Sequence, residues 1–264
     1  MPDDHVHVEQ RDRVLLITLD RQEKMNALDA GMMAALAETW ERVRQDDGIW
    51  VAIVTGAGER AFCSGRDLFA GAPGSIEYHR ARREQGDAVP PNERRWLPVD
   101  VWKPVIAAIN GYALAGGFAL ALACDFRIAA AGARLGSMAV KRNLLGAGQI
   151  VRLVHYVPFA RALELILLGD HIPAEEAQEI GLVNAVVPGE ELLATAFAWA
   201  ERLCKNGPLA VRASKEVAYR ALDLPFTEAS RFEARMYEAM LETEDVVEGH
   251  VAFRERREPV WKGR

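Results

Sequence analysis

The sequence predicts an α/β protein that ends in a helical region. Over most of the chain, short apolar runs rich in β-branched residues alternate with helical patterns, and from Pro188 onward the pattern is helical throughout. Half of the 264 residues are apolar, so the chain can bury the core of one large domain, or of one domain with a helical appendage. This composition excludes disordered and collagen-like chains.

The first elements follow a strand, helix, strand order. Residues 14–19 (VLLITL) and 50–55 (WVAIVT) are short apolar runs bounded by charged or glycine-containing segments, which is typical of buried strands. Between them, apolar residues recur at helical spacing over residues 32–43. Asp29 precedes this pattern and fits a helix N-cap.

The alternation returns further along the chain, with strands at 105–109 and 126–130 and a helix from the glycines at 116–117 to Ala123. Four C-terminal helices, separated by Pro or Gly-Pro, are predicted at 190–204, 208–222, 227–241 and 245–256. An apolar stripe that fits either a core or a subunit interface consists of Phe232, Met236, Tyr237 and Met240. We therefore expect a core over residues 1–188 and a helical subdomain over 189–264.

Charge and cysteine content narrow the class of partner. The formal charge of −6 comes from 38 acidic against 32 basic residues, which leaves no broad cationic field for a nucleic-acid backbone or an anionic bilayer. Cys63, Cys124 and Cys204 lie far apart and lack a Cys or His at metal-ligand spacing. The first residues do not form a secretory signal, and no apolar run approaches the ~20 residues of a membrane span. We expect a cytoplasmic protein without metal, membrane or nucleic-acid partners.

Two glycine-containing segments are candidates for a site that holds a developing oxyanion. At the start of the 116–123 helix, the first N–H groups have no helical partner and point outward, and glycine lets a ligand approach closely. In the segment 63–67 (CSGRD), the N–H of Arg66 could point into a cleft while Asp67 caps a following helix. Two donors from separate loops would form an oxyanion hole.

Several motifs occur in a fixed order: LDRQEKMNAL (residues 19–28), GAGERAFCSGRDL (56–68), KPVIAAING (103–111), ALAGG (113–117) and the C-terminal TEDVVEG (243–249). Together they resemble the crotonase superfamily, also called the enoyl-CoA hydratase/isomerase family, although Gln22 stands where proline is usual. The resemblance covers essentially the whole chain. It implies a crotonase-like spiral of ββα units with a C-terminal helical oligomerisation region, assembled as a homotrimer or a dimer of trimers.

The resemblance also implies an acyl-CoA thioester substrate, with coenzyme A arriving as part of that substrate and no tightly bound cofactor. The chemistry that the family shares is stabilisation of a thioester enolate. By position, the two oxyanion donors are the backbone N–H groups of Arg66 and Gly116, which the local argument also selects. The family's loop that lies along the CoA nucleotide matches residues 24–28 of this chain. The resemblance therefore implies a set of residues on the CoA side of the site: Lys24, Asn26, Ala27, Leu28, Ser64 and Asp67.

The sequence departs from the family pattern at both catalytic glutamates. The first belongs to the helix after the oxyanion glycine, where this chain has Ala119. The second belongs to a segment that LGSMAVKRNL (135–144) matches without gaps, and its position is Ala139. Alanine cannot exchange a proton, whereas a positioned acid or base contributes on the order of 10²–10⁴-fold. The usual hydration mechanism is therefore not expected.

Three interpretations remain open. A replacement acid or base could come from the loop at residues 69–100, whose candidates are Glu77, Tyr78, His79 and Glu84. The oxyanion donors alone, worth roughly 10²–10³-fold each, could support decarboxylation or slow isomerisation. The protein could also bind acyl-CoA without turning it over. A Ser-His-Asp hydrolase is disfavoured because Ser64 and Ser137 show no histidine partner.

Overall fold

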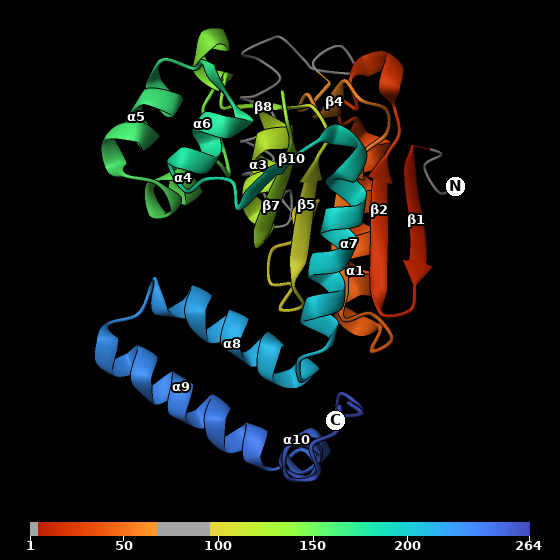
Figure 1. Ribbon diagram of the computed structural model, residues 1–264. Helices are drawn as coiled ribbons and strands as arrows, with labels where there is room; N and C mark the ends of the chain where they lie inside the picture. The colour runs from red at the N-terminus through yellow and green to blue at the C-terminus, as the bar shows by residue number, and fades with distance from the viewer. Residues whose placement is uncertain (1–4, 68–95) are drawn as a thin grey trace, which may run out of the picture.

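The computed structural model describes residues 5–67 and 96–264 (Figure 1). A six-stranded sheet has the order β1-β2-β3-β5-β7-β10 and is parallel except for the antiparallel pair β1–β2. Its strands are β1 (Val6–Arg11), β2 (Val14–Leu19), β3 (Val51–Gly56), β5 (Val105–Ile109), β7 (Phe126–Ala130) and β10 (Ala185–Val187). A four-stranded sheet consists of β4 (Ala61–Cys63), β6 (Tyr112–Leu114), β8 (Arg134–Gly136) and β9 (His171–Pro173).

The chain alternates between the two sheets. Strand β3 leads into β4, β5 into β6 and β7 into β8, and the second strands of these pairs stack in parallel. Helix α3 (Gly116–Ala123) follows β6 and returns the chain to the larger sheet. These successive turns form a spiral of strand, strand and helix, which confirms the predicted crotonase-like α/β fold.

The helices lie on both sides of the larger sheet and beyond one end of it. They are α1 (Ala30–Gln45), α3, α4 (Ile150–Tyr156), α5 (Phe159–Leu167), α6 (Ala174–Glu179), α7 (Leu192–Cys204), α8 (Pro208–Ala221), α9 (Phe226–Leu241) and α10 (Glu244–Glu255). Short 3₁₀ turns are η1 (Gln22–Lys24), η3 (Ala139–Arg142) and η4 (Gly189–Glu191). Within the described ranges, no helix combines the length and apolar character that crossing a membrane requires.

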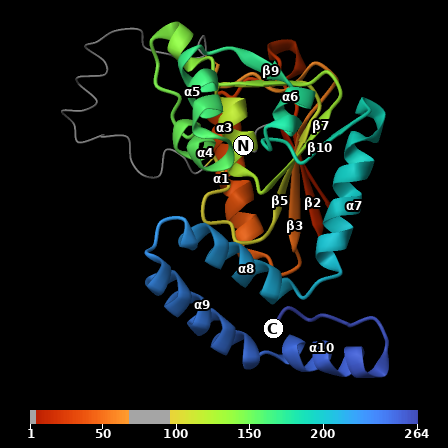
Figure 2. The ribbon, with the colours of Figure 1, turned by 60° about the vertical axis from the view of Figure 1, so that its left-hand side comes forward.

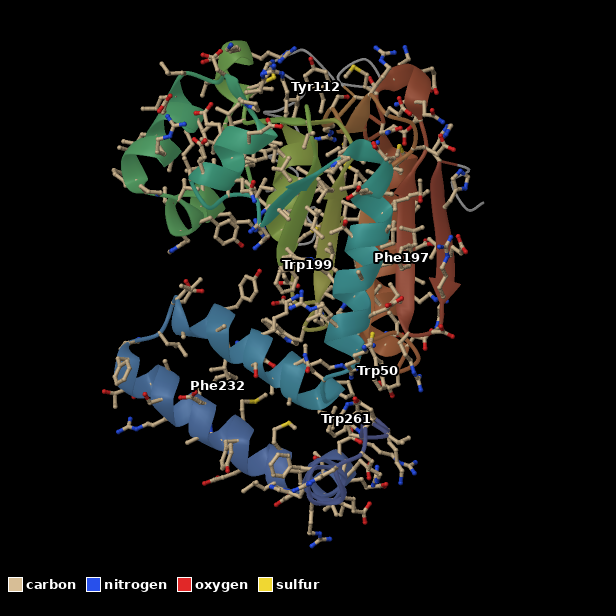
Figure 3. All side chains as sticks on the ribbon, in the orientation of Figure 1. Trp50, Tyr112, Phe197, Trp199, Phe232 and Trp261 are labelled. Atoms are coloured by element: carbon tan, nitrogen blue, oxygen red, sulfur yellow. The ribbon has the colours of Figure 1, made fainter. Side chains whose placement is uncertain are left out.

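The larger sheet is covered on both faces, which explains why its central strands β3, β5 and β7 are buried at nearly every position and are mostly apolar. In β3, Val51 and Ile53 pack in one apolar cluster, whereas Ala52 and Val54 pack in the other. Helix α1 lies on one face and α7 on the opposite face, with the sheet seen nearly edge-on between them in Figure 2. The ring of Trp199, labelled on α7 in Figure 3, also packs against this sheet: its centroid lies 5.6 Å from that of Phe126 of β7.

The predicted elements agree closely with the observed ones. The strands at 14–19, 105–109 and 126–130 have the predicted bounds, and the Asp29 carboxylate accepts the N–H of Met32 at 2.9 Å as an N-cap. Each of the four C-terminal helices begins and ends within two residues of its prediction. Strand β1 was not predicted, because it lies at the sheet edge with mostly exposed side chains, and its two apolar residues, Val6 and Val8, are too few to form a strand pattern.

Helices α8, α9 and α10 form an arm that stands away from the sheets (Figures 1 and 2). Helix α7, by contrast, packs on the larger sheet although it follows the predicted boundary at residue 188. In the predicted stripe on α9, Phe232 is half-buried beneath the Arg220 guanidinium of α8, 5.3 Å from the ring centroid. Tyr237 is exposed, so the stripe does not form a single buried face.

Candidate functional site

The segment that carries Arg66 is fixed by backbone contacts with Leu28. The N–H of Leu28 donates to the carbonyl of Gly65, and the carbonyl of Leu28 accepts the N–H of Asp67, both at 2.8 Å. In such a parallel bridge the intervening residue makes no bond to the neighbouring segment. The N–H of Arg66 is therefore directed away from Leu28, on the opposite side of the segment.

The second candidate donor, Gly116, is the first residue of α3, where N–H groups have no partner within the helix. Ala115 before it has φ +47° and ψ −115°, a conformation that non-glycine residues adopt only when their surroundings impose it. Its N–H donates to the Gly136 carbonyl and its carbonyl accepts the N–H of Ala119, both at 3.0 Å. These two bonds fix the peptide that carries the Gly116 N–H.

The two segments approach each other closely. A β-carbon placed on Gly116 would lie 3.2 Å from the nitrogen of Arg66, and one placed on Gly65 would lie 2.8 Å from the nitrogen of Gly116. Gly65 also has φ +103°, which favours glycine. Neither Arg66 nor Gly116 donates a backbone hydrogen bond to any other residue in the part of the chain that the structure describes. Two unpaired donors side by side suit an oxygen that gains negative charge.

The predicted CoA-side loop contacts this region directly. The Asn26 side chain is buried and its amide donates to the carbonyls of Ala57 at 3.1 Å and Ala61 at 2.7 Å. Its Oδ1 accepts the N–H of Arg21 at 2.9 Å. Asn26 therefore holds the loop to the turn between β3 and β4, and its side chain is directed toward protein backbone.

The other predicted CoA-side residues connect the same two segments. Lys24 is exposed, and its carbonyl accepts the hydroxyl of Ser64 at 3.4 Å. The carbonyl of Ala27 accepts Nη1 of Arg21 at 3.2 Å, and the same nitrogen pairs with the Asp67 carboxylate at 2.7 Å. The Arg21 side chain is only 15% exposed and the Asp67 side chain only 8%, so this ion pair is largely desolvated. The structure thus brings residues 24–28 and 63–67 together.

Ala119 and Ala139, the positions where the resemblance places the family's glutamates, follow Gly116 in the chain. Ala119 is fully buried on α3, and a β-carbon on Gly148 would lie 3.6 Å from its Cβ. Ala139 is half-buried at the start of η3. That these alanines replace the family's glutamates stays a prediction. The proposed replacement groups Glu77, Tyr78, His79 and Glu84 lie outside the described residues.

Sequence reasoning missed a buried polar pair that lies between β8 and α4 in the chain. Ser137 was considered only as a nucleophile, and Gln149 was not considered, yet they are 1% and 3% exposed. A β-carbon placed on Gly146 would lie 2.9 Å from the Ser137 Oγ and 3.4 Å from the Gln149 Oε1. The available signal was a glutamine between a glycine-rich turn and an apolar helix start, in the segment LGAGQIV (145–151).

Cysteine and metal chemistry are not supported by the described residues. Burial raises the pKa of both Cys63 and Cys124 to about 12, so neither thiol is a ready nucleophile at neutral pH. Over residues 5–67 and 96–264, no group of three or more His, Cys, Asp or Glu side chains is placed to hold a metal ion.

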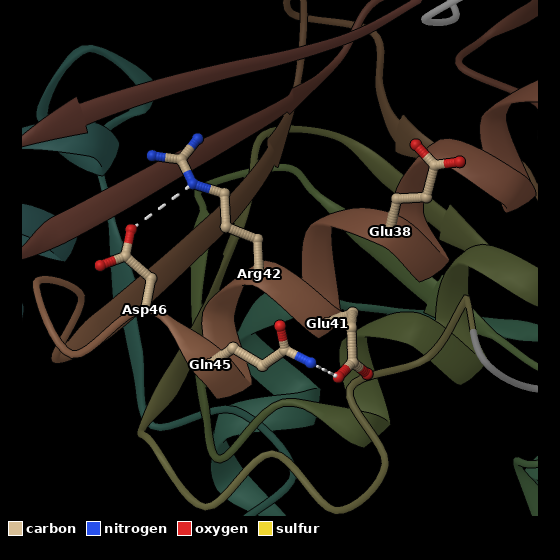
Figure 4. A pocket seen from close by; sticks show the side chains of 5 residues that line it. All are labelled: Glu38, Glu41, Arg42, Gln45 and Asp46. Atoms are coloured by element: carbon tan, nitrogen blue, oxygen red, sulfur yellow. Dashed lines mark hydrogen bonds and ion pairs between the residues drawn. The ribbon is translucent and has the colours of Figure 1, made fainter.

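A surface hollow on α1 lies apart from the two donors. It is lined by Glu38, Glu41, Arg42, Gln45 and Asp46 (Figure 4). The guanidinium of Arg42 pairs with the Asp46 carboxylate at 3.7 Å, and the Gln45 amide donates to Glu41. Because these side chains interact with one another on one exposed helix face, we assign no function to the hollow.

Comparisons with known proteins agree with this architecture. The model of the enoyl-CoA hydratase/isomerase family matches residues 9–264. The chain is 39% identical over 259 residues to (E)-benzylidenesuccinyl-CoA hydratase of Thauera aromatica, covering 98% of this chain and 99% of that protein. It is 38% identical over 265 residues to carnitinyl-CoA dehydratase of Escherichia coli K12, covering 98% of each.

Solved structures show the same similarity. An enoyl-CoA hydratase from Bacillus anthracis has a TM-score of 0.90 and 37% identity, covering 99% of this chain and all of that one. An enoyl-CoA hydratase from Mycobacterium tuberculosis H37Rv has the same TM-score, 38% identity and 99% coverage of this chain. Since the family match extends over nearly the whole length and both sheets fit the fold, the chain belongs to the enoyl-CoA hydratase/isomerase family of the crotonase superfamily.

Proposed function

We propose that this protein is an acyl-CoA-processing enzyme that holds the thioester carbonyl between the N–H groups of Arg66 and Gly116 and stabilises the enolate formed from it. The observation that carries the proposal is the close approach of two backbone N–H groups that have no partner among the described residues. Their peptides are fixed by the Leu28 bridge and by the contacts of Ala115, so little reorganisation is needed as charge develops.

Coenzyme A enters as part of the substrate and is not a separate cofactor. In this proposal its nucleotide portion lies along residues 24–28, and Lys24 supplies an exposed cation for a phosphate. The Arg21–Asp67 ion pair holds this loop against the segment that carries Arg66. In this proposal Leu28 joins the two loops through its backbone hydrogen bonds, and Asn26 and Ser64 do so through side-chain hydrogen bonds to backbone carbonyls. The carbonyl of Ala27 accepts the Arg21 guanidinium that pairs with Asp67.

The reaction should need less acid–base assistance than ordinary hydration. The relatives are named as hydratases and a dehydratase, but Ala119 and Ala139 supply no proton-exchanging group in this chain. Each missing acid or base removes on the order of 10²–10⁴-fold. We therefore propose a lyase or isomerase activity that depends on carbonyl polarisation, such as isomerisation or decarboxylation, with Glu77, His79 and Glu84 as candidate proton-transfer groups.

A single-turnover screen with crotonyl-CoA, 3-enoyl-CoA and carboxyacyl-CoA thioesters tests this proposal. We expect turnover of at least one thioester together with very slow hydration of crotonyl-CoA. Hydration at the rate of an efficient hydratase would show that the placement of the two alanines is wrong. The two alanines also favour a second function, binding without turnover; saturable thioester binding with no chemistry across the panel would support it over catalysis.

A further inference from the structure

Helix α10 makes only sparse contacts with the other helices and strands in the described part of the chain. Its buried residues are Asp245 and Ala252, and neither belongs to the two apolar clusters of the core. A buried carboxylate requires hydrogen-bond donors, which α10 does not receive from a neighbouring helix. The residues that follow α10 supply them.

The Asp245 carboxylate binds residues 257–264, which we call the strap. Its Oδ1 accepts the N–H of Lys262 at 2.7 Å, and its Oδ2 accepts the N–H of Gly263 at 2.8 Å. The backbone N–H of Asp245 in turn donates to the carbonyl of Arg264 at 3.2 Å. Asp245 is only 4% exposed, and an ionised acceptor binds N–H groups strongly where water is excluded. The strap is therefore held over the first turn of α10.

A second carboxylate on α10 binds the beginning of the strap. Glu248 accepts both terminal nitrogens of Arg257, at 2.6 and 3.0 Å, and the N–H of Val260 at 2.7 Å. The hydrogen bonds from Arg257 and from Val260 lower the pKa of Glu248 from 4.5 to about 2, so this carboxylate is ionised at neutral pH. Because Asp245 and Glu248 are three residues apart in a helix, they lie on one face of α10.

Trp261 connects the strap to the core (Figure 3). Its ring packs against the apolar cluster that one face of the larger sheet forms with α7, and its indole N–H donates to the Lys205 carbonyl, just after α7, at 2.9 Å. A β-carbon on Gly249 of α10 would lie 3.3 Å from this ring, and one on Gly207, just before α8, would lie 3.8 Å from it. The indole therefore lies between α10 and the junction of α7 with α8.

These contacts give a role to the C-terminal motif TEDVVEG (residues 243–249). Thr243 is the N-cap of α10. Asp245 and Glu248 accept the N–H groups of the strap, and Gly249 leaves room for the indole. The motif is thus the docking site of the strap as well as the start of a helix.

We propose that residues 257–264 are a conformational strap that fixes α10 to the core when it is docked on Asp245 and Glu248. Undocking of the strap releases α10 from the α7–α8 junction while both sheets stay folded, because α1 and α7 still cover the larger sheet. Phe253 of α10 is 88% exposed, so the strap also determines where this side chain is presented. The proposal does not depend on the acyl-CoA chemistry proposed above.

Amide hydrogen exchange of the full-length protein, followed by mass spectrometry, tests the strap. In Asp245→Asn, one carboxylate oxygen becomes an NH₂ group that faces a strap N–H, and in Trp261→Ala the contact with the core is removed. Each variant should exchange about tenfold or more faster over α10, whereas β2, β3 and β5 should stay within about twofold of wild type.

Glu244→Gln and Val260→Ala are the matched controls. Glu244 is the carboxylate just before Asp245, and it pairs with the exposed side chains of Lys262 and Arg264, which contributes little. Val260 lies in the strap with a 70% exposed side chain, and Val260→Ala keeps the N–H that Glu248 accepts. Both controls should exchange over α10 within about threefold of wild type.

Wild-type exchange over α10 in either Asp245→Asn or Trp261→Ala would overturn the proposal, because other contacts would then hold α10 in place. Faster exchange spread equally over α10 and the larger sheet would also overturn it, since the strap would then be part of the core rather than a separate device. Loss of thioester binding or turnover in the wild-type protein would count against the proposed function alone.

Discussion

Gly116 and Gly117, at the start of α3, are packed against different backbone atoms, so replacing each with alanine should have a different effect. Gly116 has no positive φ, and a β-carbon on it would lie 3.2 Å from the nitrogen of Arg66. The Gly116→Ala variant should fold, since alanine is better than glycine in a helix by about 0.5–1 kcal/mol. Thioester turnover should fall by roughly 10²-fold because the methyl group crowds one of the two donors. Steady-state kinetics on a variant that melts near the wild-type temperature checks this.

Gly117→Ala is the contrasting variant. Its β-carbon would lie 2.0 Å from the carbonyl oxygen of Cys63, which is backbone and cannot move aside cheaply. We expect a loss of about 3 kcal/mol in the free energy of unfolding, measured by urea denaturation. Wild-type turnover in Gly116→Ala would contradict the oxyanion assignment, and an unchanged stability in Gly117→Ala would contradict the packing of β4 against α3.

Lys103 should make the free energy of unfolding depend on pH over a defined range. Its ammonium group is buried and donates to the Asp46 carbonyl at 2.7 Å; burial, with Arg212 nearby, lowers its pKa from 10.5 to about 8. Between these values the unfolded chain binds a proton that the folded protein has released, so the free energy of unfolding rises with pH. Relative to Lys103→Met, wild type should gain stability from about pH 8 to 10.5. A constant difference between the two proteins across that range would contradict this.

Among the elements, α8 is joined to the core through Asp125. Its carboxylate accepts Lys215 Nζ at 2.6 Å, the Val105 N–H at 2.7 Å and the Tyr219 hydroxyl at 3.0 Å. Burial and the neighbouring carboxylate raise the pKa of Tyr219, which keeps it a hydrogen-bond donor. Lys215→Met should cost about 3 kcal/mol because it leaves a buried charge unpaired. Tyr219→Phe should cost about 1 kcal/mol.

Urea denaturation with amide hydrogen exchange of α8 measures both effects. The lysine variant should lose protection in α8 more than the tyrosine variant does. Equal stability of the two variants, or unchanged exchange in α8, would show that apolar packing rather than Asp125 holds this helix to the core.

The sequence was most informative where an element has a periodic apolar pattern. Strand β2 and helix α1 bury regular sets of side chains, so their positions follow from spacing alone. Strands β4, β6 and β8 have only three residues each and exist because the spiral stacks them on one another. Three-residue strands carry too little pattern to be predicted, since their pairing is a long-range contact.

At the scale of the whole molecule, the arm leaves large apolar side chains in solvent. Phe226 is 87% and Phe253 88% exposed in the single chain. Exposed apolar surface of this kind is typical of subunit contacts. We expect a particle of three or six times the 29.2 kDa chain mass, measured by light scattering or sedimentation. Phe253→Glu should lower that mass, and a wild-type monomer at micromolar concentration would contradict the expected homotrimer or dimer of trimers.

The candidate site could be predicted only in part, because some of its contacts are long-range and leave no local pattern in the sequence. Local sequence selected the segments of Arg66 and Gly116, because glycine and a helix start are visible in a single stretch of chain. The bridge from Leu28 to Arg66 joins segments far apart in sequence, and Ser137 and Gln149 approach each other from separate segments on either side of η3. No local pattern reports such contacts. Asn26 illustrates the limit, since its motif indicated the CoA-side loop but not that its side chain faces backbone.

Two backbone N–H groups that polarise one thioester carbonyl are the central claim, and difference infrared spectroscopy measures that polarisation directly. Butyryl-CoA with a ¹³C-labelled carbonyl, bound at saturation, should show a carbonyl stretch at lower frequency than in solution. The shift should be reduced in Gly116→Ala at matched saturation. An unshifted carbonyl band for thioester bound to the wild-type protein would contradict the account.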